Sequence, residues 1–259
     1  MTNERRQAEQ DSLDSTQYEM DSIRQYEAVY GKDFVSPGGR DLALELIARL
    51  QLDAGALVLD AGCGLGGSAF VMASRFDLRV EGIDLSRNMV DLAQRKLAAN
   101  GLAARVALHR GDCLQLDRQD RYHAVYSRDV FLHIADKTRL FFVLHRALRP
   151  GGQLLFTDYC CGPGPWSDGF TRYVEQRGYD LLTIERYAER IAAAGFEQVT
   201  ASDETDRFVT ILRAELARIE TLSLDAAVRS KLADSWRQKI ARADAGEQRW
   251  GLFSATRAD

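Results

Sequence analysis

Short apolar runs alternate with amphipathic segments along the chain, from about residue 41 to about residue 200. The runs end at glycine or aspartate, and the segments between them repeat apolar residues at a spacing of three or four. Bounded apolar runs are typical of buried strands, whereas the three-to-four spacing is typical of helices. The pattern therefore predicts an α/β fold, built of βα units around a mostly parallel sheet.

The elements expected from this pattern follow one another closely. We predict strands at residues 56–62, 79–85, 104–112, 122–129 and 152–159. Helices are predicted before the first strand, at residues 41–52, and between later ones, at residues 66–76, 87–100 and 137–148. Asn100-Gly101 ends one helix with residues that accept left-handed backbone geometry, and Pro150-Gly151-Gly152 turns the chain after another.

The pattern changes beyond residue 200. Two long, charged, amphipathic helices are predicted at about 207–222 and 225–245, followed by an apolar and aromatic strand at 249–257. We interpret the two helices as a lid, inserted at about residues 204–247 between the last two strands of one sheet. The expected organisation is an N-terminal lid segment, residues 1–40, and one catalytic domain, residues 41–259.

Composition excludes several classes of protein. The 259 residues are 46% hydrophobic and 28% charged, which is ordinary for a globular domain. No stretch approaches the roughly 18 continuous apolar residues of a membrane span, and the N-terminus lacks the apolar segment of a secretion signal. A formal net charge of −4 without a basic block argues against nucleic-acid binding. We expect a soluble cytoplasmic monomer that neither binds nucleic acid nor enters a membrane.

The cysteines give no sign of a metal site. Cys63, Cys113, Cys160 and Cys161 show neither CxxC spacing nor a cluster with histidine. Zinc sites and disulfide frameworks of small secreted domains depend on such patterns. We therefore expect reduced thiols and no bound metal.

The sequence LVLDAGCGLGG, residues 57–67, predicts a strand, a glycine loop and a helix N-terminus. Glycines let backbone amides approach a ligand, and the helix N-terminus adds partial positive charge. A glycine loop alone also fits dinucleotide dehydrogenases. Asp60 argues against a dinucleotide, because a carboxylate just before Gly62 and Gly64 suits a cationic amino group better than a pyrophosphate.

Acidic residues also follow the next two strands. Asp84 ends the second strand in GIDLS, where an acid can accept both hydroxyls of a ribose. Asp112 and Cys113 follow the third strand and are expected near an adenine. Leu85 and Arg128, which adjoin the ends of the second and fourth strands, complete the cofactor positions that we assign to the strand ends.

The segments LDAGCGLGG, GIDLS, GD and LRPGG together resemble the class I S-adenosylmethionine-dependent methyltransferases. The resemblance implies a Rossmann-like fold with a seven-stranded, mostly parallel sheet, helices on both faces and an antiparallel last strand. It also implies S-adenosylmethionine as cofactor and S-adenosylhomocysteine as product. Tight turns in some other α/β protein are the alternative.

Further segments narrow the resemblance to the phosphoethanolamine N-methyltransferase family. They lie at residues 14–39, 126–134, 156–160, 174–187, around 236–239 and at 248–251. By this resemblance, the phosphobase-binding positions are Gln17, Tyr18, Asp129, His133, Tyr159, Arg177, Tyr179 and Lys239. Tyr18 and His133 match the catalytic pair of the family, and Tyr26, Val35 and Ser36 match positions beside the cofactor.

The same residues suit the chemistry. A phosphate monoester carries about two negative charges near neutral pH, for which Arg177 and Lys239 supply cations and two tyrosines supply neutral donors. Methyl transfer needs an unprotonated amine, and His133 can accept a proton directly or through Tyr18. Asp129 can orient the ammonium and stabilise its charge. We assign catalytic roles to Tyr18, His133 and Asp129.

Each residue also has a structural interpretation. His133 could be a hydrogen-bonded core histidine, Arg177 and Lys239 could be solvated surface charges, and the tyrosines could close the edge of the core. Trp236 and Trp250 are interpreted as packing residues that fasten the lid and the last strand. Phe131 is bulkier than the family pattern leads us to expect, and Gly178 departs from it between Arg177 and Tyr179.

We expect N-methylation of phosphoethanolamine and its mono- and dimethyl derivatives, toward phosphocholine. One alternative keeps the fold and replaces the acceptor with an aminoalkylphosphonate or another small anionic metabolite. Another is a module that binds S-adenosylmethionine without catalysis. Turnover on a panel of acceptors separates these possibilities.

Overall fold

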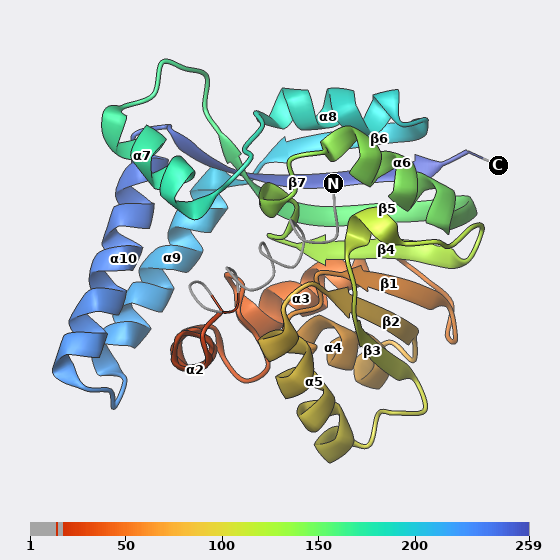
Figure 1. Ribbon diagram of the computed structural model, residues 1–259, viewed down its shortest axis with the longest axis horizontal. Helices are drawn as coiled ribbons and strands as arrows, with labels where there is room; N and C mark the ends of the chain where they lie inside the picture. Colours follow the sequence, from red (N-terminus) through yellow and green to blue (C-terminus); the bar gives the residue numbers. More distant parts are fainter. Residues whose placement is uncertain (1–13, 15–17, 259) are drawn as a thin grey trace.

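The computed structural model describes Asp14 and residues 18–258 (Figure 1). Within these residues, one sheet contains seven strands in the order β3-β2-β1-β4-β5-β7-β6. Strand β7 runs antiparallel to both of its neighbours, and the other pairs are parallel. This arrangement confirms the predicted fold class, including the antiparallel last strand. The strands are β1 Leu57–Ala61, β2 Arg79–Asp84, β3 Val106–Arg110, β4 Tyr122–Arg128, β5 Leu148–Cys161, β6 Phe196–Asp203 and β7 Gln248–Arg257.

Helices cover both faces of the sheet (Figure 1). Helices α3, α4 and α5 pack on one face, in a hydrophobic cluster that also includes α9 and α10. Helices α6 and α8 pack on the other face in a second cluster. The helices are α2 Met20–Tyr30, α3 Gly39–Ala48, α4 Gly67–Arg75, α5 Arg87–Asn100, α6 Lys137–Ala147, α7 Asp168–Arg177, α8 Ile184–Ala193, α9 Thr205–Thr221 and α10 Ala226–Asp244, with 3₁₀ turns η1 Cys113–Gln115 and η2 Phe131–His133.

Local sequence sets several element boundaries. The Ser86 side chain caps α5 by accepting a hydrogen bond from the Met89 amide, 3.1 Å away. Gly101 ends the same helix with a φ of 67°, as Asn100-Gly101 predicts. Strand β5 is longer than the predicted 152–159 because it pairs with β4 from Leu148 onward and with β7 as far as Cys161. The predicted helix 41–52 is displaced, since α3 begins at Gly39 and ends at Ala48.

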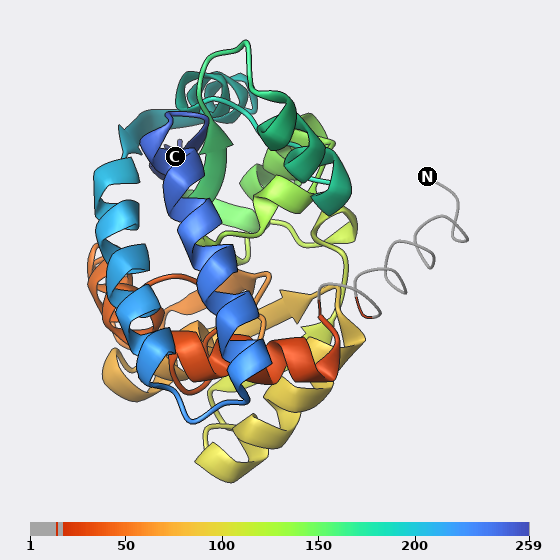
Figure 2. The same ribbon diagram turned by 90° about the vertical axis from the view of Figure 1, so that its left-hand side faces the viewer.

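Helices α9 and α10 lie between β6 and β7 in the sequence, as predicted, and pack side by side (Figure 2). Helix α2 crosses their ends in the same view. Arg218 of α9 donates a 2.7 Å hydrogen bond to the Val29 carbonyl of α2. Glu215 of α9 accepts one from the Gly38 amide at 2.8 Å and another from the Trp236 indole at 2.9 Å. The buried Glu215 carboxylate therefore ties both helices to the segment before α3.

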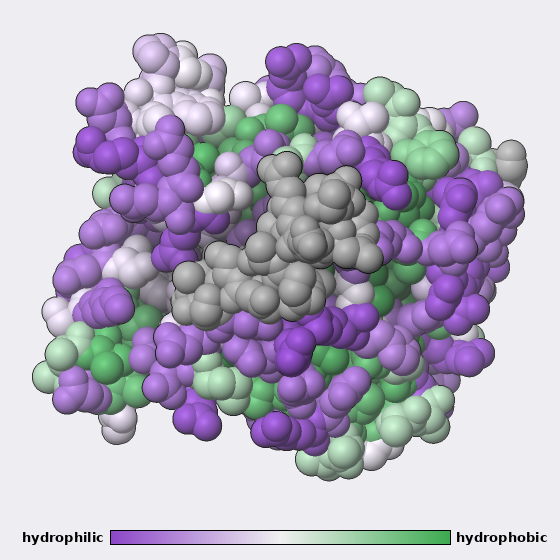
Figure 3. Space-filling model, viewed as in Figure 1, coloured by the Kyte–Doolittle hydropathy of each residue, from purple (hydrophilic) through white to green (hydrophobic). Residues whose placement is uncertain are grey.

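The surface is mostly polar on the face seen in Figure 3, with hydrophobic residues in scattered patches. Phe142 of α6 is a large hydrophobic side chain that remains 60% exposed. Among the described residues, no helix combines the length and the apolar character needed to cross a membrane.

Candidate functional site

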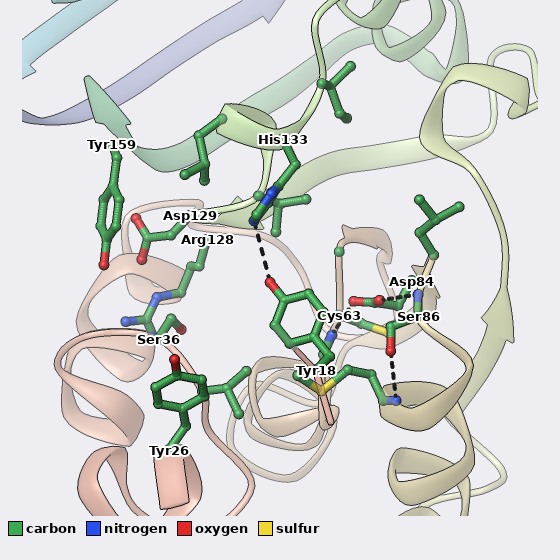
Figure 4. Close-up of a pocket in the computed structure, with 18 of the residues that line it drawn as sticks. Tyr18, Tyr26, Ser36, Cys63, Asp84, Ser86, Arg128, Asp129, His133 and Tyr159 are labelled. Carbon is green, nitrogen blue, oxygen red and sulfur yellow. Dashed lines mark hydrogen bonds between the residues drawn. The ribbon is translucent and has the colours of Figure 1, made fainter. Parts of the chain in front are cut away.

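A cavity of about 780 Å³ opens at the carboxyl ends of β1, β2 and β4. The chain runs from β1 outward through β2 to β3 and then returns to β4 on the other side of β1. Strands β1 and β4 therefore flank the point where the strand order reverses. Open α/β sheets bind ligands at such a point. The other walls come from α2, α10 and the residues around α7. In Figure 4, Tyr26 of α2 and the labelled residues at the ends of β2 and β4, among them Asp84 and Asp129, lie around a common space.

The glycine loop packs tightly against the segment that follows β4. Gly62 has a φ of 80°, and a Cβ atom built on it would lie 2.3 Å from a methyl carbon of Val130. The Gly62 and Cys63 amides both donate to the Ile83 carbonyl, at 2.8 Å and 3.0 Å. Position 62 therefore requires glycine for its backbone geometry and for its lack of a side chain.

Asp84 accepts hydrogen bonds on both carboxylate oxygens. Gly64 donates its amide to Oδ2 at 2.8 Å, and Ser86 donates its amide to Oδ1 at 2.9 Å. Each carboxylate oxygen can accept more than one hydrogen bond, so Asp84 can still accept from a diol in the cavity. Burial raises the pKa of Asp84, and the Ser86 and Gly64 amides oppose that shift.

Asp60 lies deeper, with 2% of its surface exposed. Its Oδ2 atom has no hydrogen-bond partner among the described residues. Burial, and then the charge of Asp84, raise the pKa of Asp60 to about 7. Because a nearby cation stabilises a buried carboxylate, a cationic group of a ligand would suit this position.

The remaining predicted cofactor residues line the same cavity: Tyr26, Val35, Ser36, Leu85, Asp112, Cys113 and Arg128. Asp112 and Arg128 also make hydrogen bonds within the protein. Asp112 caps η1 by accepting from the Leu114 amide at 2.8 Å. Arg128 donates to the Gly39 carbonyl at 2.9 Å and also to the Pro37 carbonyl, so it holds the loop that carries Ser36.

Tyr18 and His133 meet across the cavity (Figure 4). The Tyr18 hydroxyl lies 3.4 Å from Nε2 of His133, and the two rings pack edge to face. Burial, with the charges of Lys137 and Arg177, lowers the pKa of His133 to about 4. The histidine is therefore neutral near pH 7 and has a ring nitrogen available for a proton, but the lowered pKa makes it a weaker base than an ordinary imidazole.

Three cationic side chains line another part of the cavity: Arg177 of α7, and Lys239 and Arg242 of α10. Lys239 is 9% exposed, and its ammonium lies 3.4 Å from the Tyr30 hydroxyl and 4.6 Å from the Trp236 ring centroid. Burial lowers its pKa to about 8, and Arg242 and Arg177 add to that effect while Glu215 opposes it. The cationic cluster thus favours an anionic ligand.

Tyrosines surround this cationic cluster. Tyr159 lies with its ring centroid 5.7 Å from the Lys239 ammonium. Tyr179 packs edge to face against His133, with ring centroids 5.1 Å apart. Tyr173 lies under the Arg242 guanidinium at 3.7 Å. Phenolic hydroxyls are neutral donors that suit phosphate oxygens.

The structure thus brings every described residue of the predicted site into one cavity, whereas Gln17 lies outside the described residues. Tyr30, Tyr173 and Arg242 also line the cavity, although the sequence pattern does not single them out. Arg242 could have been found from helical spacing, because it lies three residues after Lys239 on α10 and therefore shares its face. Within the part of the chain that the structure describes, no group of three histidine, cysteine or acidic side chains could hold a metal ion.

Comparisons with known proteins agree with this geometry. The family described as "Methyltransferase domain" matches residues 58–152. The chain is 31% identical over 255 residues to a phosphoethanolamine N-methyltransferase of Plasmodium falciparum, covering 95% of each protein. It is 42% identical over 252 residues to one from Triticum aestivum, but it spans only 50% of that protein.

A solved structure is also similar over almost the whole chain. It is a phosphoethanolamine N-methyltransferase 2 of Haemonchus contortus in complex with phosphomonomethylethanolamine and S-adenosylhomocysteine, with 34% identity and a TM-score of 0.93. The match covers 96% of this chain and 60% of the other. This chain therefore spans about half the length of the wheat relative and three fifths of the nematode one.

Proposed function

The chain belongs to the phosphoethanolamine N-methyltransferase family, and from this premise we propose that it methylates the amine of phosphoethanolamine and its mono- and dimethyl derivatives, with S-adenosylmethionine as donor. The observation that supports this proposal most strongly is the composition of the cavity. It combines a cationic cluster, an acidic cofactor side, the Asp129 carboxylate and a neutral histidine in one cavity. A phosphobase carries matching groups, namely an anionic phosphate and an amine.

The cofactor side of the cavity fits S-adenosylmethionine in its charges and hydrogen-bonding groups. Asp60 Oδ2, which has no partner in the described part of the chain, would accept from the amino group, and Asp84 offers acceptors for the ribose hydroxyls. Gly62 lets the loop pack against Val130 after β4, and the Gly64 amide holds the Asp84 carboxylate beside the cavity. When bound, S-adenosylmethionine supplies an electrophilic methyl group on a sulfonium and leaves as S-adenosylhomocysteine.

The phosphate end would be held by Arg177, Lys239 and Arg242, with Tyr159 and Tyr179 as neutral donors. Arginine can hold two phosphate oxygens with its planar fork, whereas lysine adds a point charge. A dianionic phosphate also offsets the mutual repulsion of the three cations. The pKa of Lys239 then rises toward its ordinary value, which strengthens the hydrogen bonds to the phosphate.

The reacting amine must be unprotonated, because its lone pair forms the new N–C bond. An alkylamine with a pKa of about 10.4 is mostly protonated near pH 7. The ammonium would lose its proton to the Tyr18–His133 pair, in which Nε2 of the neutral His133 accepts through the Tyr18 hydroxyl. Asp129 would face the nitrogen and stabilise the positive charge that forms as the nitrogen is methylated. Alignment of the amine behind the methyl group supplies much of the rate enhancement.

We further propose that residues 1–40 and about 204–247 act as lids. We also propose that the protein is a cytoplasmic monomer. Arg177, Lys239 and Asp129 line the cavity from one chain, so a second copy is not needed to complete it. The four cysteines are free and buried, which suits a reducing compartment. Light scattering of the purified protein tests the oligomeric state, since a dimer mass contradicts the monomer.

A product assay tests the proposed activity. The purified protein is incubated with methyl-labelled S-adenosylmethionine and, separately, with phosphoethanolamine, 2-aminoethylphosphonate and ethanolamine, and the products are identified by mass. We expect one to three added methyl groups on phosphoethanolamine. Preferred methylation of the phosphonate replaces the acceptor but keeps the reaction class, and binding of the donor without methylation of any acceptor indicates a non-catalytic module.

A further inference from the structure

Asp129 has an unusual backbone and an unequal pair of carboxylate oxygens. Its φ of 56° lies in the left-handed region, and its amide donates to the Thr157 carbonyl at 2.8 Å. Oδ1 accepts hydrogen bonds from the Trp250 indole at 2.7 Å and the Thr157 hydroxyl at 3.2 Å. Oδ2 is buried without a partner among the described residues, although Asp129 lines the cavity. One oxygen is therefore fixed by the protein and the other is available to a ligand.

Trp250 is held firmly enough to fix that oxygen. It is 1% exposed, and its ring stacks on Phe208 of α9 with centroids 5.6 Å apart and an interplanar angle of 20°. Its amide donates to the Thr205 hydroxyl at 3.1 Å, and its carbonyl accepts from the Glu204 amide at 2.9 Å. The β7 register also places Trp250 opposite Tyr159. The indole N–H therefore has a set direction rather than a choice of rotamers.

We propose that Trp250 is a positioning residue for methyl transfer, whose indole N–H fixes Oδ1 of Asp129 so that Oδ2 faces the amine of the bound phosphobase. This inference rests on the proposed function for the identity of the amine. Removal of the N–H frees the carboxylate to rotate, and the interaction with the developing ammonium is then lost in part. Trp250 thus acts through Asp129 and does not itself touch the substrate.

The charge state of Asp129 depends on the same contact. Burial raises the pKa of Asp129, while Arg128, the Trp250 indole, the Thr157 hydroxyl and Lys239 oppose that shift. Loss of the indole donor must raise the pKa further, because a hydrogen bond to the charged form is removed. The charged or titratable groups that act on Asp129 from the surrounding elements are Arg128, Lys239, Asp158, Tyr18, Tyr30, Tyr126 and Tyr159.

Trp250→Phe tests the inference, since it keeps an aromatic ring against Phe208 and removes only the donor and part of the ring. We expect kcat for phosphoethanolamine to fall about tenfold or more, which is the effect of losing a hydrogen bond to a charged group. The variant raises the pKa of Asp129, and Asp129 must be ionised to act. The acid limb of the kcat/KM profile should therefore move to higher pH. The matched control is Trp166→Phe, which removes the 2.9 Å indole hydrogen bond to the Gly162 carbonyl outside the cavity and should leave both quantities near wild type.

Thr157→Val provides a second test in case Trp250→Phe does not fold. It removes the second donor to Oδ1 with little change of shape, and it should move the acid limb in the same direction. In an Asp129→Asn background, Trp250→Phe should add little further loss, because the two residues act as a unit. An unchanged acid limb in both variants, or a full additional loss in the Asp129→Asn background, overturns the inference.

A second readout separates this inference from the proposed function. Carboxyl NMR of aspartate-labelled protein without substrate follows the titration of Asp129 directly, with Asp129→Asn identifying its signal. If the wild-type protein methylates no phosphobase while Trp250→Phe still raises the Asp129 pKa, the proposed function fails and the positioning of the carboxylate stands. If the protein is active and Trp250→Phe leaves that pKa unchanged, the inference fails alone.

Discussion

The hydroxyl of Tyr18 lies 3.4 Å from Nε2 of His133, across 115 positions of the sequence. One residue precedes the first described helix, and the other ends the 3₁₀ turn after β4. Lys137 holds that turn from the far side, because its buried ammonium donates to the Ile134 carbonyl at 2.6 Å and to Asp180 at 3.1 Å. The N-terminal segment and the turn after β4 therefore supply the two residues of the proposed proton-accepting pair.

Tyr18→Phe and His133→Ala should each lower kcat for phosphoethanolamine by roughly 10²–10⁴-fold, because each removes a member of the acid–base pair. Affinity for S-adenosylmethionine should stay near wild type, since Asp60 and Asp84 hold the cofactor side. Steady-state kinetics and calorimetry measure the two effects. An equal loss of cofactor affinity indicates a structural role for both residues.

Lys239→Met should stabilise the protein near pH 7 while it weakens phosphobase binding. The folded-state pKa of Lys239 is lowered to about 8, so the folded protein binds the proton less tightly than the unfolded chain. The cost of charging the buried ammonium is fully present below about pH 8 and fades as the pH rises toward about 10.5. Its removal should add on the order of 2 kcal/mol to the free energy of unfolding at pH 7.

Denaturant unfolding of Lys239→Met at pH 7 and pH 10 measures this difference, which should shrink at the higher pH. Lys231→Met is the matched control, because Lys231 lies exposed on the same helix and its replacement should change stability little at either pH. A loss of stability in Lys239→Met at pH 7 contradicts the burial of a charged lysine.

Asp84→Asn should weaken S-adenosylmethionine binding by about 2 kcal/mol or more, because the ribose hydroxyls lose a charged acceptor in a buried site. Asparagine keeps one acceptor oxygen, so one of the Gly64 and Ser86 amides loses its partner, which loosens the glycine loop. Calorimetry gives the affinity, and Asp91→Asn, on the exposed side of α5, is the control. Unchanged affinity in Asp84→Asn would place the cofactor elsewhere.

Gly62→Ala should cost more stability than Gly55→Ala. Both positions have similar backbone geometry, with φ values of 80° and 79°. A Cβ atom at position 62 meets Val130 at 2.3 Å, whereas nothing lies within 4 Å of one at position 55. Backbone strain of about 1 kcal/mol is common to both, and the collision should add roughly 1–3 kcal/mol at position 62. Thermal or denaturant unfolding of the two variants measures the difference, and equal losses refute the tight packing of the loop.

The sequence predicts much of the sheet because buried parallel strands carry continuous apolar runs. Strand β6, Phe196–Asp203, is the exception, and its bounds could not be predicted. Most of its residues are exposed at the edge of the sheet, so it lacks an apolar pattern. Helices α7 and α8 were also not placed individually, although residues 174–187 contributed to the family resemblance.

The site was predictable where residues follow strand ends, and less so where it depends on tertiary packing. Helical periodicity marks α10 as charged and amphipathic, but it does not reveal that Lys239 is buried against Trp236. Trp250 was interpreted as a packing residue, and the structure shows that it also donates to Asp129. That hydrogen bond depends on the position of β7 beside β5, which no local pattern specifies.

Selection of a phosphate by the cationic cluster of the cavity is the proposal on which the substrate assignment depends. Its most direct test is the ratio of kcat/KM for phosphoethanolamine to kcat/KM for ethanolamine, measured with the same S-adenosylmethionine concentration. Ethanolamine leaves Arg177, Lys239 and the tyrosine donors without their partner in a closed site, so the account predicts a preference of about 10⁴-fold for phosphoethanolamine. Comparable values for the two amines would contradict the phosphobase assignment and leave a class I methyltransferase with another small-molecule acceptor.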